Sequence, residues 1–456
     1  MRKEGNTIGS LTMKTSRRKF ISTSLMGGLA AAAMPLSSCK LEQSDKAAPI
    51  QSDTAAPIDL KSRYATLDEI LKQPVLKREL FASPVIIDTV ELLRDRNSFL
   101  CRVRSKDGAE GISVGHPSVN RLSWPVMRGL IRGFVGKDAR DLDALITWAS
   151  EPGAKSCGVP KSVQIATLEI AVLDMLGNIV DKPIGQLIGE IHHPRIAVYQ
   201  GTRYVEMRRM EPEESLELVK QDLLKSKAKA IKIRGGVGDQ MGTDADNAPG
   251  RTEKLIKLTR ETFGDEMVLA LDGNGSYGPE EAIRIGRILE EYNFLFYEEP
   301  IPWDWYEEQK QVADALDIQM AGGEEEFRMR AFRWLIANDA FDIVQPDQLY
   351  FGGLIRSMKV ARMAAAFGKT IIPHMSDGGL GYLYMLHFVS ACPNAGPYHE
   401  FKLFATRDGN GNNVPIESKT EPFTSEDGVI KVPTGSGLGL TIDPDYIKTH
   451  HPVEEW

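Results

Sequence analysis

The chain has 456 residues and a formal net charge of −8, from 55 lysines and arginines against 63 aspartates and glutamates. Hydrophobic residues make up 42% and aromatic residues 7%, which excludes a disordered or fibrous chain. The acidic balance argues against a nucleic-acid-binding protein, which would carry a basic face. The cysteines lie far apart and form no CxxC pair, which excludes a thiolate zinc site and a disulfide-rich scaffold: Cys39, Cys101, Cys157 and Cys392.

Residues 1–39 have the pattern of an export signal. Arg17 and Arg18 precede an apolar, Gly- and Ala-rich stretch over 21–36, as in twin-arginine signal peptides. That stretch is too short and too weakly apolar for a membrane-spanning helix. Residues 36–39 resemble a bacterial lipobox with Cys39 as the acylated residue, and plain export without acylation is the alternative. We therefore expect an exported bacterial protein that is periplasmic or held at a membrane only by a lipid anchor.

A short imperfect repeat follows the signal, QSDKAAPI over 43–50 and QSDTAAPI over 51–58. Small residues and prolines cannot bury a core, so the sequence predicts a flexible tether over 40–80.

Residues 81–192 predict a small α+β domain. Two strands are expected over 85–92 and 99–103, joined by a polar turn over 94–97. Three helical stretches follow, the last over about 162–188, where apolar residues recur at helical spacing.

From 193 to 401 short apolar strands alternate with amphipathic helices. We expect eight strands, over 196–201, 230–234, 268–272, 294–298, 318–321, 342–345, 370–373 and 397–401. Regular alternation favours parallel strands closed into a (β/α) barrel. Residues 402–456 are rich in Gly and Pro and lack the barrel period, so we expect them to fold back on the first domain. The fold class is therefore α/β, a modified TIM barrel with a cap formed by the N-terminal region and the C-terminal tail.

Carboxylates recur where the predicted barrel strands end, which is where the active sites of such barrels lie. Asp272, Glu298 and Glu324 follow one another at intervals of 26 residues, one repeat each. On adjacent parallel strands these side chains would converge. Three carboxylates without a thiolate form a hard-oxygen site of the kind that Mg2+ prefers. The alternative is that each is a solvated loop acid.

Asp347 and His374 end the next two predicted strands, 27 residues apart. A carboxylate beside an imidazole fixes its tautomer and raises its basicity, so His374 is a candidate general acid or base. The remaining histidines carry weaker signals. His116 lies in a loop of the first domain that could face a substrate, and the pairs at 192–193 and 450–451 have no comparable context.

Several motifs together resemble the enolase superfamily, specifically its mandelate racemase-like subgroup, from about Pro84 to the C-terminus. They are Lys232-x-Arg234, Asp272-x-Asn274, Glu298-Glu-Pro300, Ala321-Gly-Gly-Glu324, Pro346-Asp347 followed by Gly352-Gly353, and Pro373-His374. The helix over 168–177, followed by Lys182-Pro183, is similar to the helix that joins cap and barrel in that family.

The resemblance implies one Mg2+ held by Asp272, Glu298 and Glu324, and removal of the proton α to a carboxylate. The metal would stabilise the negative charge that develops on the carboxylate oxygens. No lysine occurs over 345–350, where the muconate-cycloisomerase-like and dipeptide-epimerase branches carry one, and the Asp347–His374 pair is present. Both features favour the mandelate racemase-like branch.

The resemblance also assigns the remaining polar residues. Glu400 matches the family's acid on the eighth strand, with His399 as the competing choice, and Lys232 would contact the substrate carboxylate. Arg234, Asn274 and His399 are the candidate substrate-binding residues. Many members carry a second lysine base where this chain has Arg234. A guanidinium is a poor proton acceptor at neutral pH, so racemisation by two bases is disfavoured.

A single base fits dehydration, and we expect an acid-sugar dehydratase that forms a 2-keto-3-deoxy acid. The alternatives are a racemase, epimerase or cycloisomerase that uses the same intermediate, or a non-catalytic lipoprotein that binds sugar acids. The partner is a small carboxylate, and the family is often multimeric. The cap loops near 94–97 and 115–120 and the insertion over 235–251 would select the substrate.

Overall fold

The structure is a computed structural model that describes residues 59–116, 123–151, 158–201, 207–238, 240–376, 380–401, 406–420 and 422–454. It divides into two compact units, Met1–Asp59 and Leu60–Trp456. The second unit contains a cap and a barrel. The predicted signal peptide, the lipobox at Cys39 and the first part of the tether lie outside the described residues.

The cap contains a four-stranded antiparallel sheet in the order β15-β1-β2-β3. Its strands are β1 (Ile87–Asp95), β2 (Ser98–Ser105), β3 (Glu110–Val114) and β15 (His451–Pro452). Both strands predicted for this domain are present, whereas β3 was not predicted. A Cβ on Gly111 of β3 would lie 2.1 Å from the carbonyl oxygen of Ala171, so glycine lets this strand pass close under a helix.

Four helices complete the cap: α2 (Ser123–Phe134), α3 (Leu142–Ser150), α4 (Val159–Val180) and α5 (Ile184–Ile188). Helix α4 is long and apolar enough to cross a membrane, but 83% of its most apolar window is buried inside the protein, as in a core helix. The predicted helix over 162–188 is therefore two helices. They are separated at Asp181, whose φ of +50° is left-handed, and at Pro183.

The barrel contains all eight predicted strands, and they are parallel. They are β4 (Arg195–Gly201), β5 (Ala230–Arg234), β6 (Val268–Asp272), β7 (Phe296–Glu298), β8 (Gln319–Gly322), β9 (Ile343–Val344), β10 (Thr370–Ile371) and β11 (His399–Phe401). Hydrogen bonds connect them in the order β10-β9-β8-β7-β6-β5-β4-β11. A bridge between Ile371 and Ala395 joins β10 to the chain just before β11, which closes the ring.

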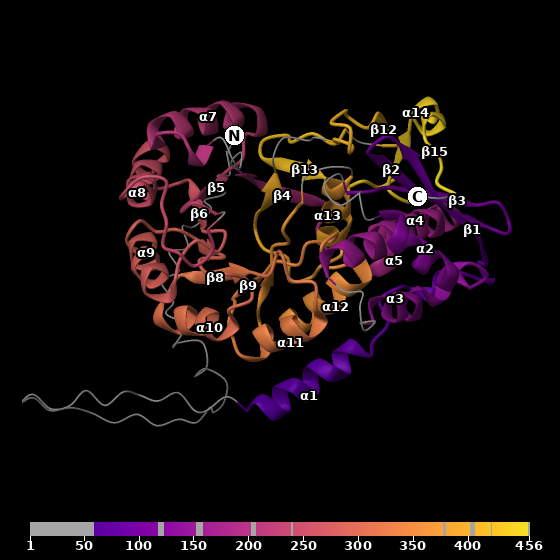
Figure 1. The fold of residues 1–456 in the computed structure, drawn as a ribbon, viewed down its shortest axis with the longest axis horizontal. Helices are drawn as coiled ribbons and strands as arrows, with labels where there is room; N and C mark the ends of the chain where they lie inside the picture. Colours follow the sequence, from indigo (N-terminus) through magenta and orange to yellow (C-terminus); the bar gives the residue numbers. More distant parts are fainter. Residues whose placement is uncertain are drawn as a thin grey trace, which may run out of the picture. The chain divides into compact units, whose positions relative to one another are not determined.

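Helices lie outside the strands, as Figure 1 shows. They are α7 (Pro212–Ser226), α8 (Arg251–Phe263), α9 (Pro279–Glu291), α10 (Tyr306–Ala315), α11 (Met329–Ala337), α12 (Leu354–Ala365) and α13 (Gly381–Ser390).

Side chains that face the barrel axis change from apolar to polar along each strand. Ala230, Ala270 and Phe296 belong to a small apolar cluster inside the barrel. Two residues further along the same strands come Lys232, Asp272 and Glu298. Because alternate residues of a strand share a face, these polar side chains stand on the apolar cluster, at the carboxyl ends of the strands.

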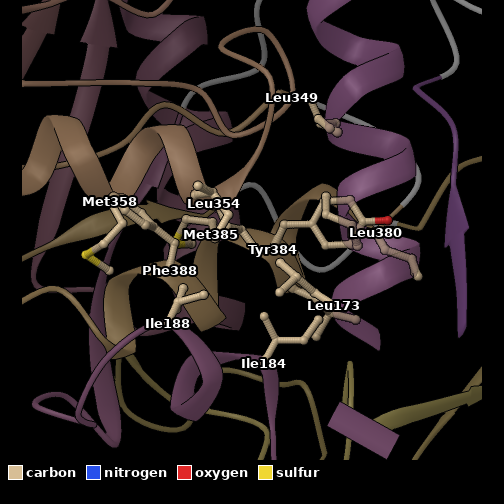
Figure 2. Close-up of a cluster of buried hydrophobic side chains, with 14 of the residues drawn as sticks. Leu173, Ile184, Ile188, Leu349, Leu354, Met358, Leu380, Tyr384, Met385 and Phe388 are labelled. Atoms are coloured by element: carbon tan, nitrogen blue, oxygen red, sulfur yellow. The ribbon is translucent and has the colours of Figure 1, made fainter. Parts of the chain in front are cut away.

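Cap and barrel share an apolar core (Figure 2). It joins Leu173 of α4 and Ile184 and Ile188 of α5 to Leu354 and Met358 of α12, and continues into α13. The cap is thus packed against the barrel helices on the side nearest β9 to β11.

The C-terminal segment returns to the cap, as the sequence predicts, and it also extends the barrel sheet. Strand β13 (Val429–Lys431) pairs antiparallel with β4, and β12 (Ile416–Ser418) pairs with β14 (Leu440–Ile442). Helix α14 (Pro444–Thr449) then leads into β15, which pairs with β1 at the edge of the cap sheet (Figure 1).

The prediction of a flexible tether over 40–80 is wrong for its second half. Helix α1 spans Leu60–Leu71, and a 3-10 turn follows at Arg78–Leu80. Arg63 of α1 donates to both carboxylate oxygens of Asp339, at 2.6 and 2.8 Å. Arg333 of α11 donates to both oxygens of Asp68, at 2.7 Å each. These long-range ion pairs bind the helix to the barrel and could not be recognised from local sequence.

Candidate active site

The three predicted metal ligands converge at the carboxyl ends of β6, β7 and β8. Asp272 and Glu298 are the last residues of neighbouring strands and are register partners. Glu324 follows β8 after a glycine with a φ of +105°. The three side chains are buried, and one carboxylate oxygen of each lies within 4.8 Å of the others.

Two cations from β5 compensate this negative charge. Lys232 donates to Glu298 and lies 3.7 Å from Asp272 and 3.8 Å from Glu400. Arg234 donates to Asp272 at 2.6 Å. Burial alone would lower the pKa of both cations, but the surrounding carboxylates raise both values, that of Lys232 well above its usual range. The surrounding carboxylates thus favour the protonated form of both side chains.

The acids of the cluster fit a divalent cation. Burial is the main reason why the pKa of Glu298 is raised to about 8. Asp272 and Glu324 raise it further by repulsion, and Lys232 only partly offsets these effects. Oε2 of Glu324 is buried and has no hydrogen-bond partner among the described residues. Three buried carboxylates, one of them with an unsatisfied oxygen, form the donor set that suits Mg2+.

Glu299 fixes the backbone that carries Glu324. Its Oε1 accepts the backbone N–H groups of Gly323 and Glu324, at 3.2 and 3.3 Å. Glu299, Glu324 and Glu325 form a second close group of carboxylates that shares Glu324 with the first. Burial, followed by repulsion from Glu325, holds the pKa of Glu299 well above its usual range.

Asp347 and His374 form the predicted pair. Nδ1 of His374 lies 2.9 Å from Oδ2 of Asp347, which also accepts the backbone N–H of Ser376 at 2.7 Å. Nε2 of His374 faces the carboxylate cluster, 3.8 Å from Oε2 of Glu324. Burial would lower the pKa of His374, but Glu324 and Asp347 outweigh it and raise the value to about 9.

Of the two candidates on β11, the structure brings Glu400 to the site and not His399. Oε2 of Glu400 accepts the backbone N–H of Met375 at 3.2 Å, and Oε1 faces Lys232. Neighbouring residues of a strand point to opposite faces. His399 accordingly lies on the outer face of β11, where its Nε2 contacts the carbonyl of Gly396 at 3.0 Å. The expectation that His399 binds substrate is therefore corrected.

Asn274 links the cations to the metal ligands. Its Oδ1 accepts from Arg234 and from Arg208, and its Nδ2 lies 3.5 Å from Oε1 of Glu324. Arg208 could not be identified from the sequence, because it lies between β4 and α7 and belongs to no motif.

Gln345 was also not assigned a role from the sequence. Its Nε2 donates to Oε2 of Glu298 at 2.8 Å. Its place at the end of the sixth predicted strand was the one available signal.

The insertion over 235–251 contacts the segment that follows Asn274. Gly242 donates to the carbonyl of Gly275 at 2.8 Å, and Asp244 donates to that of Ser276 at 3.1 Å, directly after Asn274. From the cap, the His116 ring lies 5.5 Å from that of Tyr350, which stacks 6.1 Å from His374. Residues 117–120 of the predicted cap loop lie outside the described residues.

A capped barrel with three converging carboxylates and an Asp–His pair defines the enolase-type class of enzyme. Residues 214–446 match the family model described as enolase C-terminal domain-like. The arabinonate dehydratase of Saccharolobus solfataricus is 31% identical over 278 residues, 61% of this chain and 69% of that protein. The L-talarate/galactarate dehydratase of Salmonella typhimurium is 29% identical over 285 residues, 61% of this chain and 67% of that protein.

Among solved structures, a mandelate racemase/muconate lactonizing protein from Paracoccus denitrificans, complexed with magnesium, superimposes with a TM-score of 0.69. That similarity covers 80% of this chain and 98% of the other, at 24% identity, and it supports the fold. The chain belongs to the enolase superfamily and to its mandelate racemase-like subgroup.

Proposed function

We propose that the protein is a Mg2+-dependent acid-sugar dehydratase that converts a sugar acid into a 2-keto-3-deoxy acid. The observation that carries this proposal is the presence of one base beside the carboxylate cluster. Nε2 of His374 faces Glu324, whereas Lys232 and Arg234 are held as cations by Glu298 and Asp272. Racemisation needs a proton acceptor on each side of the carbon, and elimination needs only one. The dehydratases among the relatives support the same reaction class.

Asp272, Glu298 and Glu324 would hold the metal. Bound there, Mg2+ would supply the positive charge that makes the proton α to a carboxylate removable. Lys232, buried beside Glu298, would add to that positive charge.

The protein's own residues carry the proton steps. In the neutral imidazole, Asp347 accepts the Nδ1 proton of His374, which leaves Nε2 free to take the α-proton. The pKa of about 9 reflects the negative charge of Glu324, and a cation held by that carboxylate would lower it. As the C–H electron pair forms the enol double bond, the β-C–O bond breaks and the hydroxyl leaves as water. Its proton comes from Nε2 of His374 or from the Glu400 carboxyl. The enol then becomes the 2-keto-3-deoxy acid, so that the net change is the loss of one water.

The test is a library of acid sugars incubated with Mg2+ and protein from Lys40 onward, scored for 2-keto acid. Asn in place of His374 should reduce keto-acid formation by about 10²–10⁴-fold, which is the usual contribution of general acid–base catalysis. His399→Asn is the matched control, since it replaces a buried histidine on the outer face of the barrel and should leave turnover within about twofold. Turnover that survives His374→Asn would refute the proposal.

We further propose that residues 1–39 direct export and that Cys39 carries a lipid. The paired arginines, the apolar stretch and the lipobox-like end support this proposal. Cell fractionation should find the protein in the membrane fraction, and Cys39→Ala should release it in soluble exported form. Retention of the wild-type chain in the cytoplasm would contradict the proposal.

A further inference from the structure

We propose that Glu169, on cap helix α4, is a positioning residue for the Asp347–His374 pair and acts through the N-terminus of barrel helix α12. This inference rests on the proposed function for its effect on turnover, but its geometry is independent of it.

Glu169 supplies the N-cap that α12 lacks. Its side chain is fully buried, and Oε1 accepts the backbone N–H groups of Leu354 and Ile355 at 2.5 and 3.0 Å. These are the first two donors of α12, which the helix itself cannot satisfy. The residue at the N-cap position is Gly353, which has no side chain with which to accept them. A carboxyl from the cap domain therefore completes a helix of the barrel.

The glycine pair of the sequence motif makes room for this contact. Gly353 has a φ of +111°, and a Cβ on it would lie 2.4 Å from Oε2 of Glu169. Any larger residue would push the carboxyl away from α12. The motif Gly352-Gly353, which the proposed chemistry leaves unexplained, is therefore part of the contact between cap and barrel.

A closed turn connects this contact to the acid–base pair. Gly353 donates to the carbonyl of Gln348 at 2.8 Å, and Phe351 donates to that of Asp347 at 2.9 Å. Oδ1 of Asp347 accepts the N–H groups of Leu349 and Tyr350, at 2.7 and 2.9 Å. With both ends hydrogen-bonded, a shift at Gly353 moves Asp347, whose Oδ2 holds Nδ1 of His374.

Packing supports the same connection. Leu349 of the turn and Leu354 of α12 lie in one apolar cluster with Leu173 of α4 (Figure 2). Apolar contacts fix the distance between cap and barrel, but they are not directional and do not fix the orientation of α12. The hydrogen bonds from Leu354 and Ile355 to Glu169 fix that orientation.

Glutamine can replace the carboxyl in this role. Burial raises the pKa of Glu169 to about 8. The two backbone donors and Arg356 lower it, but by less than burial raises it. The group is thus neutral at pH 7 and has an acceptor oxygen that an amide also offers.

The experiment compares Glu169→Leu, Glu169→Gln and Asp174→Leu in otherwise full-length protein. Asp174 is the matched control, because it is a buried carboxyl on the same helix that accepts two backbone N–H groups, from Ile112 and Leu438 at 2.9 and 2.8 Å. Its partners belong to the cap sheet and the C-terminal segment rather than to α12. Both leucine variants should lose stability, and thermal unfolding shows by how much.

Two readouts separate positioning from general destabilisation. In NMR spectra of protein with ¹⁵N-labelled histidine, the Nδ1 proton that His374 shares with Asp347 should give a low-field signal. Its absence in His374→Asn assigns it to His374. Glu169→Leu should shift or abolish this signal and lower kcat by about tenfold to a hundredfold, with KM within about twofold. Glu169→Gln and Asp174→Leu should retain both the signal and kcat.

An unchanged His374 signal and kcat in Glu169→Leu would overturn the inference, and so would equal losses in Asp174→Leu. If Glu169→Leu does not fold, the smaller change Glu169→Ala removes the same acceptor and should give the same losses. If the wild-type protein dehydrates no acid sugar, the proposed function fails, and the His374 signal alone decides the role of Glu169.

Discussion

Buried charge at the strand ends is compensated within the protein for two of the three metal ligands. Glu298 is paired with Lys232, and Asp272 is paired with Arg234. Glu324 lies 3.8 Å from His374, and burial and neighbouring acids raise its pKa more than His374 and Lys232 lower it. A divalent cation bound there would supply further positive charge.

Mg2+ should therefore stabilise the folded protein, and Glu324→Gln should abolish the effect. At a concentration 100-fold above Kd, a ligand specific for the folded state adds about 2.7 kcal/mol. Thermal unfolding with and without Mg2+, together with titration calorimetry, measures this directly. Glu326→Gln is the control, because that buried carboxylate two residues away binds Arg328 and Tyr306 instead. Equal loss of Mg2+ binding in both variants would contradict the assignment.

The site residues could be predicted from the sequence where the barrel repeat of about 26 residues fixed their position. The 26-residue spacing placed Asp272, Glu298 and Glu324 on adjacent strands, and the structure brings them together. The face of the strand on which His399 lies could not be predicted from the sequence. Next to Glu400 on a strand of three residues, its face depends on register, and a shift of one residue exchanges the two faces.

Helix α1 is one of the elements that local sequence could not predict. It follows a low-complexity repeat and carries a weak apolar pattern, with Leu67 as its buried residue. Its helix is held by tertiary ion pairs with Asp339 and Arg333, whose positions are set by the barrel. Stretches stabilised by distant partners lack the periodicity on which sequence prediction depends.

The docking of α1 should weaken in acid. Burial alone would raise the pKa of Asp339, but Arg63 and Lys369 lower it to about 2. A carboxyl with a lowered pKa stabilises the fold above its unfolded value of 3.8, and this contribution is lost as the pH falls through about 2. The protection of residues 60–71 against hydrogen exchange, taken relative to the intrinsic exchange rate at each pH, should fall severalfold between pH 4 and pH 2. Asp339→Asn should lower that protection at pH 7 and weaken its pH dependence, because the Asp68–Arg333 pair is then left to titrate. An unchanged profile would contradict the docking role.

At the scale of the molecule, the C-terminal segment connects barrel and cap. Val453 donates to the carbonyl of Leu92 at 2.9 Å, and the Tyr446 hydroxyl donates to Asp408 at 2.8 Å. Inside the cap, Nε2 of His450 lies 2.9 Å from the hydroxyl of Ser98. The return of this segment was predicted from its lack of the barrel period, but its pairing with β4 and β1 was not, because strands of two or three residues carry no recognisable pattern.

Removal of residues 443–456 should destabilise the cap. At about 1 kcal/mol per hydrogen bond, the lost contacts amount to at least about 2 kcal/mol. Thermal unfolding of the truncated chain should show a lower midpoint. Replacement of the exposed His451 by Ala should leave the midpoint unchanged. A truncated chain as stable as the full one would show that β15 contributes nothing to the cap sheet.

If dehydration proceeds with a single base, the fate of solvent deuterium will reveal it. With an acid sugar that the protein consumes in D2O, we predict a 2-keto-3-deoxy product with deuterium at C3. The remaining substrate should keep its hydrogen and its configuration at C2. Deuterium at C2 in a substrate of inverted configuration, without keto acid, would contradict the account, because it requires proton delivery from a second face that Lys232 and Arg234, as fixed cations, are not expected to serve.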